Sequence, residues 1–167
     1  MNNQAAIDRF WRAYLATLPP GDEPPPQPEA WSFGDNPALA DELAGLVLAG
    51  IKTATCSALW AYEAEGESLP QPGQPGVILG GAGQPLAVVE TVEVQIKPFD
   101  QVDAAFAYDE GEDDRSLASW RTEHQRYFTR TLPAIGRQFD EAMLLICERF
   151  RVLYQWPGAA DSLRRQP

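Results

Sequence analysis

Basic residues, cysteines and long hydrophobic runs are scarce in this chain, and each scarcity excludes a class of protein. Only 13 lysines and arginines oppose 24 acidic residues, which gives a net charge of −11. A protein that holds long nucleic acid through its phosphates needs a basic surface, so we predict no long duplex partner. Two cysteines, Cys56 and Cys147, do not build a disulfide-rich scaffold.

The hydrophobic segments are short. No run approaches the roughly 18 apolar residues that a membrane-spanning helix needs, and the first twenty residues carry charges where a secretory signal has an apolar core. We therefore expect a cytoplasmic protein with no membrane partner. The 167 residues, 44% of them hydrophobic, are enough for one domain with a buried core.

The distribution of proline and apolar residues indicates three parts. Residues 4–18 carry an apolar stripe at helical spacing, and six prolines then occupy residues 19–28. We predict an N-terminal helix with a stiff connector over residues 1–28. The main domain is expected at residues 29–156, followed by a small, polar, mobile tail at residues 157–167.

The main domain alternates between helical and strand patterns. Asn36 and Pro37 are typical of a helix start, and Asp113 or Asp114 is expected to cap a helix in which Trp120, His124 and Phe128 share one face. Apolar or β-branched runs predict strands in four places: 51–59, 77–79, 86–96 and 142–156. The glycine-rich segment between the second and third lacks the ending of a phosphate loop and predicts a hairpin turn. This pattern predicts an α+β fold on a small barrel or curved sheet.

Lys52 is one of only two lysines, and it stands between a predicted helix and an apolar strand. Partial desolvation there would lower its pKa and make it usable as a base. The commoner alternative is a cation that reaches solvent and complements the helix C-terminus. Thr55 follows three residues later, and in a regular strand the two side chains face opposite ways. Their cooperation therefore requires a bend after Gly50.

Three further polar residues stand in unusual surroundings. His124 is the only histidine, and its aromatic neighbours on the helix favour a partly buried, hydrogen-bonded structural residue. Glu110 begins an acidic run, which is most often a solvated loop and only a weak metal signal. Glu90 interrupts an apolar strand and is expected to pair with Lys52 or with an arginine, because an unpaired buried charge is costly.

Four short motifs together make the sequence resemble the ASCH domain family. They are Lys-Thr-Ala-Thr-Cys within FGDNPALADELAGLVLAGIKTATC (33–56), Glu-Thr within QPLAVVETVEV, Glu-Gly-Glu-x-Asp, and Trp-Arg-x-x-His. They occur in the family's order over roughly residues 30–155. The resemblance implies a PUA-like fold, a small β-barrel with surrounding helices and a cleft. It also implies a link to RNA or modified nucleosides.

One branch of the family hydrolyses the acetyl amide of N4-acetylcytidine with a lysine, a threonine and a glutamate. By resemblance these catalytic residues fall on Lys52, Thr55 and Glu110, and Glu90 is a second choice for the glutamate. In the implied mechanism, neutral Lys52 takes the proton of Thr55, whose hydroxyl attacks the acetyl carbonyl. This hydrolase is the leading hypothesis, and it needs no cofactor and no metal ligand.

The chain is longer than the proteins of that branch and in this respect resembles a larger branch of the ASCH family. RNA binding and metal-assisted RNA cleavage have been proposed for the larger branch. An RNA-binding module or a metal-dependent ribonuclease is therefore the alternative, and only the ribonuclease requires a divalent metal. The expected partner is a small nucleoside or a short RNA, and the oligomeric state is left open. The side chains expected to contact it are Trp60, Glu90, Trp120, Arg121, His124 and Tyr127.

Overall fold

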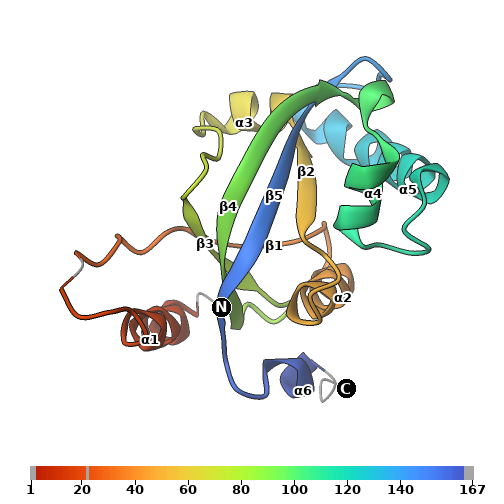
Figure 1. The fold of residues 1–167 in the computed structure, drawn as a ribbon. Coiled ribbons are helices and arrows are strands. Elements are labelled where there is room, and N and C mark those ends of the chain that lie inside the picture. The colour runs from red at the N-terminus through yellow and green to blue at the C-terminus, as the bar shows by residue number, and fades with distance from the viewer. Residues whose placement is uncertain (1–2, 22, 164–167) are drawn as a thin grey trace. The chain divides into compact units, whose positions relative to one another are not determined.

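The computed structural model describes residues 3–21 and 23–163. It has an α+β fold in which five strands are hydrogen-bonded in the order β1-β3-β4-β5-β2 (Figure 1). The chain forms two units, one from the segments up to Gly50, Pro75–Glu90 and from Arg151 onward, the other from Ile51–Gln74 and Thr91–Phe150. The long strands β4 (Pro85–Pro98) and β5 (Leu144–Gln155) each contribute to both units. The predicted fold class is confirmed.

The first unit contains the predicted hairpin. Strand β3 (Pro75–Leu79) pairs antiparallel with β4, and the short strand β1 (Ala30–Ser32) pairs parallel with β3. Aromatic residues of α1 (Gln4–Leu15) form a core with valines of the two hairpin strands. Helix α1 begins at the predicted residue, Gln4, and ends at Leu15, three residues before the predicted end.

Three helices, α2, α4 (Ala104–Glu110) and α5 (Leu117–Thr131), begin at a residue whose side chain caps the first turn. Helix α2 (Pro37–Leu48) starts as predicted, with the Asn36 side chain accepting a hydrogen bond from the backbone N–H of Leu39.

The expected tail contains a short helix, α6 (Ala159–Leu163), which contacts α2. Residues 164–167 of that tail lie outside the described residues. Its predicted mobility and the domain boundaries stay predictions.

The second unit contains the antiparallel pair of β2 and β5 and the later part of β4. Strand β2 (Ala54–Ala58) pairs with β5, so that Thr55 lies opposite Glu148 and Cys56 opposite Cys147. Helix α4 (Ala104–Glu110) contacts β2, and α5 (Leu117–Thr131) contacts α4 (Figure 1). Alternate residues of the strands pack against these helices in one apolar core, with Ala54, Ala58, Phe106, Trp120 and Cys147 among its members.

Several short elements of this unit were not expected from the sequence. They are α3 (Leu59–Glu65), α4 and the 3₁₀ helices η1 (Phe99–Gln101) and η2 (Leu132–Ile135). Helix α5 is capped by Ser116, whose hydroxyl accepts from the backbone N–H of Ser119, and not by Asp113 or Asp114. Asp114 instead accepts from the backbone N–H of Ser116. No helix within the described ranges is both long enough and apolar enough to cross a bilayer.

Candidate functional site

A buried lysine two residues before β2 is bound by two carboxylates. Lys52 is 1% exposed, and its ammonium donates to Glu110 Oε2 at 2.9 Å and to Glu112 Oε1 at 2.7 Å. Burial alone would lower the pKa of Lys52, but the two carboxylates outweigh it and raise the pKa above its usual value. Lys52 is therefore a cation at neutral pH. Its partner is not Glu90, one of the two possibilities that the sequence left open.

Glu110, the last residue of α4, uses both carboxylate oxygens. Oε2 accepts from Lys52, while Oε1 accepts from the indole N–H of Trp120 at 3.1 Å and lies 3.5 Å from Nε2 of His124. Burial would raise the pKa of this carboxyl, but the charges of Lys52 and His124 and their hydrogen bonds hold it well below its usual range. Glu110 is consequently a buried, ionised carboxylate at the centre of a polar cluster.

His124 reaches Glu110 from the neighbouring helix. Its ring stacks on Trp120 with the centroids 4.2 Å apart, and Nδ1 lies 2.9 Å from the Trp120 carbonyl oxygen one turn earlier in α5. A proton on Nδ1 satisfies that carbonyl and directs Nε2 toward Glu110. Burial would lower the pKa of His124, but Glu110 outweighs it and raises the pKa. The histidine is partly buried and hydrogen-bonded, as the commoner interpretation of its pattern predicts, and it belongs to the cluster.

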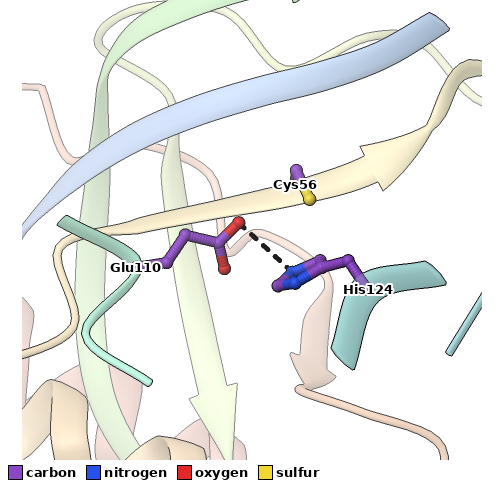
Figure 2. Close-up of side chains that lie close together, drawn as sticks. All are labelled: Cys56, Glu110 and His124. Atoms are coloured by element: carbon purple, nitrogen blue, oxygen red, sulfur yellow. Dashed lines mark ion pairs between the residues drawn. The ribbon is translucent and has the colours of Figure 1, made fainter. Parts of the chain in front are cut away.

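Cys56, which is partly buried, completes this group from β2. Its sulfur, a ring nitrogen of His124 and a carboxylate oxygen of Glu110 all lie within 4.8 Å of one another. Figure 2 shows the three side chains pointing toward one another from β2, α4 and α5. Burial, and then the charge of Glu110, raise the pKa of the Cys56 thiol well above its usual value. Without a positive ion beside it, the sulfur therefore keeps its proton.

Gly111, in the turn after Glu110, permits this arrangement because it has no side chain. Gly111 has φ +76°, and a Cβ placed on it would lie 2.6 Å from the carbonyl oxygen of Ile51. The two chain segments can therefore approach closely where Lys52 meets Glu110 and Glu112.

We expect Gly111→Ala to destabilise the protein more than Gly136→Ala does. Gly136 also has a left-handed φ of +70°, but a Cβ placed on it would have nothing within 4 Å. The control substitution should cost about 1–2 kcal/mol in backbone strain. Gly111→Ala should cost about 1–3 kcal/mol more, because its methyl group meets backbone. Urea unfolding of the two variants measures the difference, and equal losses would contradict the close approach.

The opposite face of β2 carries a second polar group. Side chains alternate along a strand, so Thr55 and Ser57 lie on the face away from Ala54 and Cys56. Thr55 is the direct cross-strand neighbour of Glu148, and such neighbours have Cβ atoms about 4.5–5.5 Å apart. The Thr91 hydroxyl donates to Glu148 at 2.6 Å. This half-buried surface, which includes Tyr62 of α3, is called the threonine face below.

The threonine face contains groups with shifted protonation. Burial raises the pKa of Glu148, and the hydrogen bond from Thr91 only partly opposes it. Burial, and then the charge of Glu148, also raise the pKa of Tyr62, whose hydroxyl is hydrogen-bonded to Ser57. A carboxylate with a raised pKa is a stronger base than an ordinary one. Glu148 is therefore suited to accept a proton from a neighbouring hydroxyl.

The remaining residues expected at the site have other partners. Glu90 accepts from Arg151 at 2.6 Å, which is the arginine alternative for its partner. The guanidinium of Arg121 donates to the backbone carbonyls of Asp100 and Val102. Trp60 lies under the guanidinium of Arg137, with 5.0 Å between the charge and the ring centroid.

Tyr127 packs against the core of the second unit and lies 5.7 Å from the guanidinium of Arg130. The structure thus brings Lys52, Glu110, Trp120 and His124 together and directs Thr55 to the other face of its strand.

Glu112, Cys56 and Glu148 are among the residues of these groups that the sequence does not predict as site residues. Glu112 stands in an acidic run that is typical of a solvated loop, yet its side chain is 26% exposed and bonded to Lys52. The signal that could have identified Cys56 is spacing, because residues 52, 54 and 56 are alternate positions of an extended segment and lie on one face. Glu148 has no local signal, because its role depends on strand register.

The comparisons with known proteins agree with this description. The fold is α+β and consistent with a PUA-like barrel. Residues 29–154 match the sequence profile of the ASCH domain, and the chain belongs to the ASCH domain family. No curated protein matches the sequence.

Two solved structures are similar to this one. The ASCH domain from Lactobacillus crispatus JV V101 is 32% identical, with a TM-score of 0.84 over 93% of this chain and 100% of that chain. Protein EF3133 from Enterococcus faecalis V583, described as DUF984, is 38% identical, with a TM-score of 0.81 over 89% of this chain and 88% of that chain. Both similarities extend over most of the length of each protein.

Proposed function

We propose that this protein hydrolyses the acyl amide of an N4-acylated pyrimidine nucleoside, of which N4-acetylcytidine is the type, and that Thr55 is its nucleophile. The observation that carries the proposal is the pairing of Thr55 with Glu148. A hydroxyl is a weak nucleophile unless a base removes its proton, and Glu148 is a directly opposed carboxylate with a raised pKa. The resemblance to the acetylcytidine-hydrolysing branch supports the choice of substrate.

The chemical steps balance with these two side chains and one water. Glu148 takes the hydroxyl proton of Thr55, and Oγ1 bonds to the acyl carbonyl carbon. The bond from that carbon to N4 then breaks, and Glu148 returns the proton to the leaving amine, which releases cytidine. Water, deprotonated by Glu148, cleaves the Thr55 ester and releases acetate, and the proton returns to Thr55.

The proposal replaces Lys52 with Glu148 as the base. Lys52 lies between two carboxylates that keep it charged, and an ammonium ion has no lone pair with which to accept a proton. Thr55 also faces away from the core side of β2, where Cys56 contacts the same cluster as Lys52. In this assignment Lys52 holds Glu110 and Glu112 in place, and the threonine face carries the reaction.

A small substrate suits this protein better than an RNA strand. Helix α5 carries three arginines, Arg121, Arg126 and Arg130, that could contact phosphates. Arg121 donates to backbone carbonyls, Arg126 pairs with Glu123, and Arg130 lies over the ring of Tyr127. The net charge of −11 repels a polyanion. RNA binding is therefore the weaker candidate.

The direct test is turnover of N4-acetylcytidine by the purified protein, followed by chromatography with and without a chelator. We expect cytidine and acetate in equal amounts, with no loss of rate in the chelator. Absence of turnover by folded protein would contradict the proposal. Cleavage of a short RNA that stops in chelator would support the ribonuclease instead.

A further inference from the structure

The buried cluster on the core side of β2 has the ligand set of a metal site. We propose that Cys56, Glu110 and His124 bind a thiophilic divalent ion of the Zn²⁺ type, through Sγ, a carboxylate oxygen and Nε2. Thiolate, imidazole and carboxylate are the three protein ligands that Zn²⁺ uses. The site is distinct from the threonine face and does not depend on the proposed hydrolysis.

The distances fit such an ion with little movement. Zn²⁺ bonds to nitrogen and oxygen are about 2.0–2.2 Å long, so two such ligands of a tetrahedron lie roughly 3.3–3.5 Å apart. Nε2 of His124 and Oε1 of Glu110 are 3.5 Å apart already. All three ligand atoms lie within 4.8 Å of one another, and they come from three different elements, β2, α4 and α5 (Figure 2).

The surrounding residues orient the ligands as they do in established metal sites. Nδ1 of His124 lies 2.9 Å from the Trp120 carbonyl, which keeps a proton on Nδ1 and makes Nε2 the nitrogen that binds an ion once its own proton is displaced. The Trp120 indole and the Lys52 ammonium each donate to one oxygen of Glu110, at 3.1 Å and 2.9 Å. Each carboxylate oxygen has a second lone pair, so these hydrogen bonds still allow coordination.

The charges also balance. An entering ion displaces two protons, the thiol proton of Cys56 and the Nε2 proton that His124 shares with Glu110, so two positive charges leave as two arrive. Glu112 remains to neutralise Lys52, at 2.7 Å. The ion therefore adds no net charge to a region of the protein that is largely shielded from water.

Cobalt(II) is the probe, because it replaces Zn²⁺ and reports its ligands by absorption. Adding Co²⁺ to the reduced full-length protein should produce a near-ultraviolet thiolate-to-cobalt band and the strong visible bands of a tetrahedral site. One equivalent of Zn²⁺ should abolish both, and Mg²⁺, which prefers oxygen ligands, should not. Absence of both bands in the unaltered protein at excess Co²⁺ would overturn the proposal.

Matched variants identify the sulfur. Cys147 is the control, because it is the cross-strand neighbour of Cys56 and shares its face but is not one of the three proposed ligands. Cys56→Ala should lose the charge-transfer band, and Cys147→Ala should keep it. His124→Gln should weaken Co²⁺ binding by more than the roughly 10–100-fold that loss of an outer-shell partner costs.

Thermal unfolding gives a second measurement that does not depend on colour. Zn²⁺ should raise the Tm of the unaltered protein and of Cys147→Ala, but not that of Cys56→Ala. A band, or a Zn²⁺-dependent Tm, that survives Cys56→Ala and disappears in Cys147→Ala would overturn the assignment.

Discussion

Lys52→Met is expected to lower the free energy of unfolding by about 3–5 kcal/mol. Methionine fills much of the same volume but leaves Glu110, which is 1% exposed, without its ammonium partner. A buried carboxylate without a cation must either remain charged at a high cost or take up a proton. Urea denaturation of the variant and the unaltered protein at neutral pH measures the loss. The slope of the unfolding free energy against urea concentration should be the same for both proteins.

Lys97 provides the matched control, because it is the only other lysine in the chain. It pairs with Asp103 at 3.4 Å, and water reaches both side chains. The exposed fraction is 25% for Lys97 and 57% for Asp103. Lys97→Met should therefore change stability by no more than about 0.5–1 kcal/mol. Similar losses in the two variants would contradict the buried charge pair.

A second substitution separates loss of the charge pair from loss of packing. The double variant Lys52→Met/Glu110→Gln removes both charges of the Lys52–Glu110 pair. The double variant should therefore be more stable than Lys52→Met alone. If the double variant instead shows the sum of two independent losses, then Lys52 stabilises the protein through its packing rather than through its charge.

The elements of this fold are predictable where local chemistry decides them. Asn36 followed by Pro37 sets the start of α2 because the cap and the first turn involve only neighbouring residues. The hairpin of β3 and β4 likewise follows from two apolar runs joined by glycines. Helix α4 is not predictable in this way, because its seven residues are few and its stability comes from burying Phe106 and Ala107 against other elements.

The candidate site is predictable only in part, for a related reason. Lys52, Thr55 and Glu110 stand in recognisable motifs, but which of them meet depends on strand alternation and on contacts between distant segments. Lys52 reaches Glu110 because Gly111 lets two segments that are far apart in sequence approach each other. The partner of Thr55 is Glu148, far later in the chain, and only the register of β2 on β5 identifies it. No local pattern contains that information.

Glu148→Gln is expected to reduce kcat/KM for N4-acetylcytidine by about 10²–10⁴-fold, the usual contribution of a general base. Glutamine keeps the shape and can still contact Thr91, but it cannot accept the proton of Thr55. The same substitution at Glu141, which is exposed, should leave kcat/KM unchanged. Equal activity of Glu148→Gln and the unaltered protein would remove Glu148 from the mechanism.

The pH dependence of turnover identifies the base more sharply. A base acts only when ionised, so kcat/KM should rise with pH through the pKa of Glu148, which burial raises above the usual value of a glutamate. The hydrogen bond from Thr91 lowers that pKa, because it stabilises the carboxylate. Thr91→Val should therefore move the acidic limb of the profile to higher pH while activity at high pH is retained. A limb that stays in place would mean that the titrating group is not Glu148.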